Sequence, residues 1–123
     1  MVFAGGTLRS GIEAVLDAID FAGQVKDADL VITGEGKIDG QTAYGKLPVG
    51  VAYRAKQKGV PVLVIAGDIG DGIEAVYDVG IDAVMSSVNR AMSLKEAMGR
   101  SSELLIDSAE RAMRMIRLGM DLC

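Results

Sequence analysis

The sequence predicts an α/β protein in which a parallel sheet lies between helices in three layers, as in Rossmann-like folds. Three short apolar runs, rich in β-branched residues, alternate with segments of helical periodicity along the 123 residues. The runs show little polar–apolar alternation, which is typical of strands buried on both faces. Strands separated by helices run parallel, with right-handed crossovers. We expect the strands at 29–33, 62–66 and 82–86.

Capping boxes predict three helix starts, because a Ser or Asp and a Glu three residues later satisfy each other's free N–H groups. They lie at Ser10 to Glu13, Asp71 to Glu74 and Ser93 to Glu96. Another helix is expected to begin near Pro48 and to stop at Gly59. The last helix is expected to be the longest, with one apolar face running from Leu94 to Ile116.

Composition excludes several classes of function. The net charge of −4 and the 4% aromatic content argue against a nucleic-acid surface. The chain has no histidine, so acid–base chemistry would fall to Asp, Glu, Lys or Tyr. The longest apolar run, residues 60–66, is too short to span a membrane. The single cysteine, Cys123, suits a reducing compartment, so we expect a cytoplasmic protein.

A long connection between the first strand and the next helix carries the functional signal. Ligands of open parallel sheets bind beyond the carboxyl ends of the strands. We expect this loop to run from Gly34 to about Leu47, and loops of that length are usually functional. Its glycines allow backbone N–H groups to approach a phosphate. Its acids, Glu35 and Asp39, suit magnesium binding or proton removal, and its lysines, Lys37 and Lys46, suit phosphate.

Structural alternatives stand beside these roles. Asp39 before Gly40 is also a common turn residue. Thr33 and Thr42 suit phosphate binding or turn capping, Asp68 suits metal binding or a turn, and Arg90 suits a carboxylate or solvent.

The segment from Gly40 to Lys46 also matches a P-loop pattern, G-x-x-x-x-G-K, in part. The next residue is Leu47 where the pattern needs Ser or Thr, and the strand is expected to end as early as Thr33. We therefore interpret the match as coincidental.

The longer pattern resembles the family of two-domain glycerate kinases that includes the bacterial glycerate 2-kinases. The shared pattern comprises Thr33 to Gly36, Ile38-Asp39, Gln41-Thr42, Gly45-Lys46, Pro48 and Gly50 to Ala52. The resemblance implies ATP-dependent phosphorylation of D-glycerate with magnesium. It implies catalytic roles for Asp39, Glu35 and Lys46, with Asp39 and Glu35 as metal ligands. It also implies substrate or nucleotide binding by Thr33, Gly34, Gly36, Gln41, Thr42, Gly67 and Asp68.

The resemblance places residues 1–123 in the C-terminal, Rossmann-like part of a protein about three times as long. We therefore expect a missing second domain and an isolated chain that folds without turnover, with a homodimer possible. The alternative is a non-catalytic module that binds a nucleotide or anion, or that docks onto another subunit.

Overall fold

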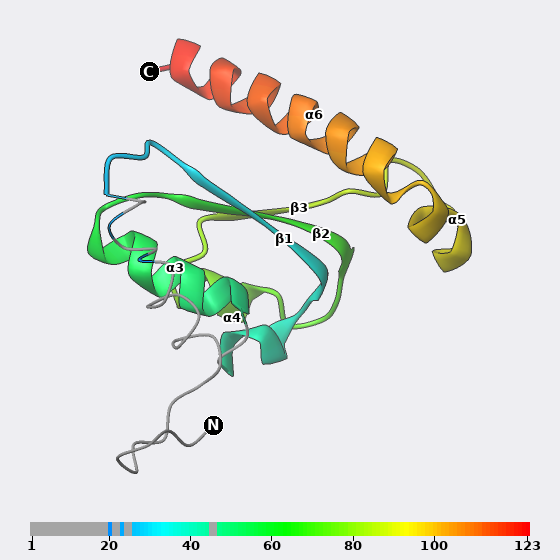
Figure 1. Cartoon of the computed structure of the whole chain (residues 1–123), viewed down its shortest axis with the longest axis horizontal. Helices are drawn as coiled ribbons and strands as arrows, with labels where there is room; N and C mark the ends of the chain where they lie inside the picture. The colour runs from blue at the N-terminus through cyan, green and yellow to red at the C-terminus, as the bar shows by residue number, and fades with distance from the viewer. Residues whose placement is uncertain (1–19, 21–22, 24–25, 45–46) are drawn as a thin grey trace.

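The computed structural model describes residues 20, 23, 26–44 and 47–123 (Figure 1). The helix expected after Ser10 lies outside these residues. In the described part of the chain, no helix is long and apolar enough to cross a membrane.

Three parallel strands form the sheet in the order β1-β2-β3. They are β1 (Val31–Ile38), β2 (Val62–Ile69) and β3 (Ala83–Ser86). Val31 of β1 pairs with Val62 of β2, and Leu63 of β2 pairs with Ala83 of β3. The α/β class predicted from the sequence is confirmed.

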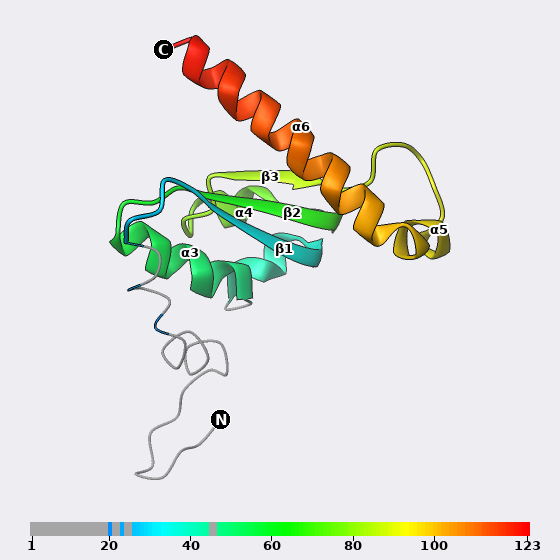
Figure 2. The ribbon, with the colours of Figure 1, turned by 45° about the horizontal axis from the view of Figure 1, so that its top comes forward.

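Helices cover both faces of this sheet (Figure 2). The helices α3 (Leu47–Gln57) and α4 (Glu74–Tyr77) lie on one face, and α6 (Ser101–Asp121) crosses the other. The short helix α5 (Leu94–Gly99) precedes α6, and a 3-10 turn, η1 (Gly40–Tyr44), follows β1. The three-layer arrangement that the sequence predicts is therefore present.

The core lies mainly between the sheet and the α3 face. Its fully buried members include Ala52 of α3, Val64 of β2, Val76 of α4 and Ile81. A smaller cluster, formed by Leu63, Ile65 and Ala112, joins the other face to α6. Apolar side chains on both faces explain why β2 reads as one continuous apolar run.

The first two strands are longer than the sequence predicted. β1 continues through Gly34 and Gly36 to Ile38, and β2 continues to Ile69. The predicted loop from Gly34 to Leu47 is therefore wrong in its first part. Glycine is a poor strand former, but pairing with β2 extends as far as Ile38 opposite Ile69, and this tertiary context overrides the propensity.

The helix boundaries agree with the sequence in part. The hydroxyl of Ser93 accepts a hydrogen bond of 3.1 Å from the N–H of Glu96, which confirms that cap. The cap at Asp71 is wrong: α4 begins at Glu74 after Ile73, and no side-chain bond caps it within the described residues. The predicted last helix is divided at Arg100, whose φ of −109° and ψ of 17° are not helical.

Three small or apolar residues of α6, four positions apart, hold this helix on the sheet. Leu104, Ser108 and Ala112 are buried, whereas Ile106 is 72% exposed. The Ser108 hydroxyl donates to the carbonyl of Leu104 and lies 3.4 Å from that of Ser87, after β3. The start of α6 is thereby fixed beside the carboxyl ends of the strands.

Candidate functional site

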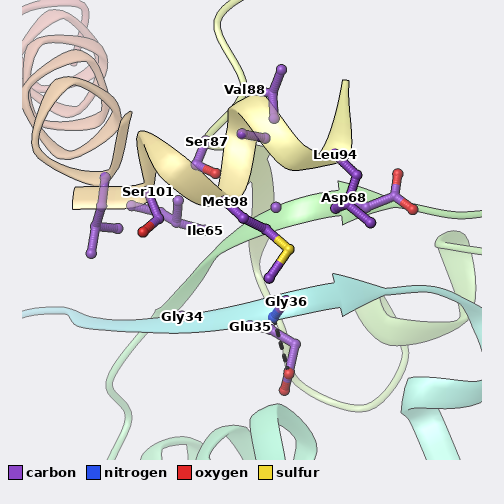
Figure 3. A pocket seen from close by; sticks show the side chains of 13 residues that line it. Gly34, Glu35, Gly36, Ile65, Asp68, Ser87, Val88, Leu94, Met98 and Ser101 are labelled. Carbon is purple, nitrogen blue, oxygen red and sulfur yellow. Dashed lines mark hydrogen bonds between the residues drawn. The ribbon is translucent and has the colours of Figure 1, made fainter. Parts of the chain in front are cut away.

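A hollow of about 510 Å³ lies where β1 and β2 meet α5 and α6 (Figure 3). Of the residues that the sequence singled out, five line it: Gly34, Glu35, Gly36, Gly67 and Asp68. The opposite wall comes from the helices and from the segment after β3, and it includes Val88, Leu94, Met98, Ser101 and Leu105. The structure therefore brings the glycines of two strands and Asp68 together at the edge where ligands of parallel sheets bind.

The glycines of β1 form the floor of this hollow. Gly34 pairs with Ile65, whose side chain is on the α6 face of the sheet, and Gly36 lies on the same face because strand residues alternate. A Cβ on Gly34 would come no closer than 3.9 Å to a described atom, the carbonyl oxygen of Ile65. A Cβ on Gly36 would meet open space within 4 Å among the described residues. A side chain at either position would therefore occupy the hollow.

At Gly67, the neighbouring backbone leaves no space for a side chain. A Cβ there would lie 2.9 Å from the carbonyl oxygen of Gly36, which is too close for any side chain. The backbones of β1 and β2 thus approach each other closely at the floor of the hollow.

Glu35 contributes its backbone to the hollow, but its carboxylate points away from it (Figure 3). One carboxylate oxygen accepts a hydrogen bond of 3.1 Å from the N–H of Gly36. Thr33 lies on the same side of β1 as Glu35, because the two are two residues apart. Both residues therefore lie on the face of the sheet that α3 covers.

Asp39 and Thr42 form a hydrogen-bonded turn just beyond β1. The Asp39 carboxylate accepts a bond of 2.9 Å from the N–H of Gln41, and the N–H of Asp39 donates to the Thr42 hydroxyl at 3.1 Å. Thr42 is fully buried and its own N–H donates to the carbonyl of Asp39 at 3.0 Å. The turn role that the sequence left open for Asp39 is present in the geometry.

The remaining candidates lie near this turn or outside the described residues. Gln41 is exposed in η1. The side chains of Lys37 and Asp39 both lie close to Gly70. A Cβ added to Gly70 would be 3.2 Å from Cε of Lys37 and 3.0 Å from Cβ of Asp39. Lys46 is not among the described residues. The sequence argued against a P-loop on two grounds. The first, an early strand end, does not hold, because β1 ends at Ile38 and not at Thr33. The second holds, because Leu47 stands where the pattern needs Ser or Thr.

A second hollow, of about 580 Å³, adjoins the first. Both are lined by Gly67 and Asp68, so these residues lie at the junction. The second hollow also includes Arg90 and the serines Ser86 and Ser93. Its lining is thus richer in polar groups than that of the first.

Sequence reasoning missed the wall that α5 and α6 supply. Met98 and Leu105 were read as part of an apolar core face, but they are 68% and 50% exposed and line the hollow. The available signal was positional, because a helix that starts after the last strand must begin at the carboxyl edge of the sheet.

This geometry defines an α/β protein with its hollows at the carboxyl ends of parallel strands. Residues 1–117 match the model of the glycerate kinase family. The chain is 56% identical to a glycerate kinase of Halalkalibacterium halodurans over 109 residues, which are 89% of this chain and 29% of that protein. It is 39% identical to the glycerate 2-kinase of Escherichia coli over 98% of its length and 32% of the relative's.

A solved structure agrees with these relatives. A crystal structure assigned as a glycerate kinase 2 from Salmonella typhimurium LT2 superimposes with a TM-score of 0.70 at 39% identity, covering 98% of this chain and 30% of that one. The chain belongs to the glycerate kinase family. It spans about 30% of the length of the curated relatives it matches.

Proposed function

We propose that this chain is part of a kinase that transfers the terminal phosphoryl group of ATP to a hydroxyl of D-glycerate, with magnesium. The observation that carries the proposal is the pair of adjoining hollows that share Asp68, in a chain of the glycerate kinase family. Phosphoryl transfer needs two substrates positioned side by side more than it needs covalent chemistry. Adjoining hollows at one sheet edge provide such neighbouring positions.

The second hollow suits the acceptor. Glycerate carries one carboxylate and two hydroxyls, and Arg90 supplies a cation while Ser86 supplies a hydroxyl. A guanidinium binds a carboxylate in a fixed, two-pronged geometry, so Arg90 would orient the substrate as well as attract it. Replacing Arg90 by Ala should raise KM for glycerate by about tenfold, which corresponds to the loss of about one charge-assisted hydrogen bond.

Magnesium would be held by one carboxylate of this chain together with phosphate oxygens and water. The described residues contain no cluster of three or more potential ligands, and magnesium in kinases usually takes only one or two carboxylates. Glu35 and Asp39 are four residues apart, so an extended backbone separates their Cα atoms by about 13 Å. This separation favours one of the two as a ligand, with the ion supplying charge neutralisation to the phosphates.

Asp39 is the stronger of these two candidates, because Glu35 turns toward the α3 face while Asp39 stands at the carboxyl end of β1. Its carboxylate would bind the ion or remove the proton of the attacking hydroxyl. Lys46 would neutralise phosphate, and the backbone of Gly34 and Gly36 would line the nucleotide. Thr33, Gln41 and Thr42 would support this arrangement, Thr42 by holding Asp39 through the hydrogen bond already described.

The rest of the active site would come from the remainder of a longer cytoplasmic protein, because one open sheet edge cannot clamp two substrates and exclude water. Exposed apolar side chains of α6 agree with a surface that another part of the protein covers: Ile106, Met113, Met115, Leu118 and Met120. The same surface favours the alternative function, a non-catalytic module that docks onto another subunit, and it would also serve a homodimer.

A coupled assay of ADP release separates these functions. The protein that contains this sequence should release ADP from magnesium-ATP only when D-glycerate is present. The Arg90→Ala variant should need more glycerate for the same rate, and Lys58→Ala, an exposed lysine beyond α3, should behave as the wild type. ADP release that does not depend on glycerate would contradict the proposed function, and no ADP release at all would favour the docking module.

A further inference from the structure

We propose that the first hollow is the pocket for the purine base of the nucleotide, which lies on the Gly34–Gly36 backbone beneath Met98. The inference rests on the proposed function and assigns one part of one substrate to one site. The volume of the first hollow, about 510 Å³, is within the range of small-molecule sites.

The chemistry of the lining selects the base among all parts of the two proposed substrates. Glycerate and the triphosphate are anionic, and they would lose water here without gaining a cation, because the described lining contains no Lys or Arg. The charged lining residues are Glu35, whose carboxylate points away, and Asp68, which repels anions. The base is the only uncharged, largely apolar part of either substrate.

The shape of the hollow fits a flat ring. Its floor is the strip of backbone at Gly34 and Gly36, where missing side chains leave open space. Glycine within a strand commonly marks a place where a ligand approaches the backbone. Met98 extends from α5 toward Gly36 across the hollow (Figure 3). A thioether above an aromatic ring is a favourable contact, and nucleobases are commonly held between apolar or aromatic surfaces.

Asp68 gives this pocket a polar end. It lies at the junction with the second hollow and is exposed, so its carboxylate can accept hydrogen bonds. A carboxylate is an acceptor only, and it suits the ribose hydroxyls or an exocyclic amino group. The sugar would therefore leave the base pocket at Asp68, toward the hollow that suits the acceptor.

The test is a calorimetric titration of the full protein with four probes: ADP, adenosine, inorganic tripolyphosphate and D-glycerate. Gly36→Val fills the floor of the pocket with a residue that strands favour, and Met98→Ala removes the cover. Each should weaken the binding of ADP and adenosine by about tenfold or more, and leave tripolyphosphate and glycerate unchanged. The controls are Gly119→Ala on α6 and Tyr53→Ala, an exposed side chain of α3, which lie outside the lining of the hollow and should alter none of the affinities.

The outcomes separate this inference from the proposed function. If wild-type protein phosphorylates glycerate but both pocket variants bind adenosine as tightly as the wild type, the base lies elsewhere and the kinase stands. If glycerate-dependent turnover is absent, the proposed function fails, and the adenosine titrations still report on the pocket. Wild-type protein that binds neither adenosine nor ADP would overturn the inference outright. If the Gly36→Val protein does not fold, the titrations of Met98→Ala decide the question, because Met98 is exposed and its replacement should leave the fold intact.

Discussion

Asp82 joins two parts of the chain by accepting hydrogen bonds from Lys56 of α3 and from the backbone N–H of Val62, the latter at 2.7 Å. Asp82 directly precedes β3, and Val62 is the first residue of β2. One carboxylate oxygen therefore ties a crossover helix to the amino ends of two strands. These contacts lie at the end of the sheet opposite the two hollows, so they concern stability and not the site.

Replacing Asp82 by Asn should lower the free energy of unfolding by about 1 kcal/mol at neutral pH, because both side chains of the ion pair are about 40% exposed. The measurement is denaturant unfolding. The matched control is Asp78→Asn, an exposed acid after α4, which should change stability by less than about 0.5 kcal/mol. Equal losses in the two variants would show that the Asp82 contacts do not stabilise the fold.

The same contacts predict a pH dependence. Burial, the largest single influence, raises the pKa of Asp82, but the hydrogen bonds from Lys56 and Val62 and the charge of Lys56 together hold that pKa below its ordinary value. Because the folded pKa lies below the unfolded one, the contribution is present above about pH 4 and is lost as the pH falls through the folded pKa. Wild-type protein should therefore lose its advantage over Asp82→Asn in acid. An advantage that does not shrink as the pH falls below about 4 would contradict this assignment.

The sequence predicted the order of elements and the edge that carries the hollows, because β-branched runs and helical periodicity report burial directly. It misjudged where β1 ends, because the pairing of Gly34 to Ile38 with β2 depends on a partner about 30 residues away. It also grouped Glu35 with Gly36 in one site, although alternation along β1 sends the Glu35 side chain to the face opposite the one on which Gly36 leaves open space. The sequence predicted the start of α5 at Ser93 but not the break at Arg100 that separates it from α6, because the apolar pattern continues across that residue.

Asp39 offers a way to separate a structural role from a catalytic one. Asp39→Asn keeps an oxygen that can accept the Gln41 N–H bond, so the turn and the stability should survive. It removes the negative charge, so kcat should fall by about 10²-fold or more. Asp39→Ala should lose both the hydrogen bond from the Gln41 N–H and the negative charge, and it should lower the free energy of unfolding by about 1 kcal/mol. Turnover by Asp39→Asn at the wild-type rate would leave this residue as a turn former only.

Leu104 holds α6 against the sheet and is 1% exposed. Leu104→Ala should reduce the free energy of unfolding by about 2–4 kcal/mol, through lost burial and the cavity that it leaves. Ile106→Ala is the matched control, since Ile106 is 72% exposed two residues along the same helix. Thermal unfolding of both variants checks this. If Ile106→Ala lowers the free energy of unfolding of the full protein as much as Leu104→Ala does, another part of that protein covers the outer face of α6.

Ser93 caps the helix that carries Met98. Ser93→Ala removes the acceptor of the Glu96 N–H bond and should destabilise α5 by about 1 kcal/mol. Because α5 is only six residues long, its amides should exchange with solvent faster in the variant than in the wild type, while the amides of β2 should not change. Hydrogen exchange detects this, with Ser102→Ala in the first turn of α6 as the control. Unchanged exchange in α5 would mean that packing, and not the cap, holds this wall of the hollow.

Phosphorus NMR of the reaction mixture tests the central claim most directly, because it observes the product itself. The protein that contains this sequence, incubated with ATP, magnesium and D-glycerate, should produce a phosphomonoester signal of phosphoglycerate in step with ADP. The isolated 123-residue chain, measured beside it, should fold but yield no such signal, because we propose that the rest of the larger protein closes the site. Conversion of ATP to ADP and free phosphate alone, or no conversion by the larger protein, would contradict the assignment as a glycerate kinase.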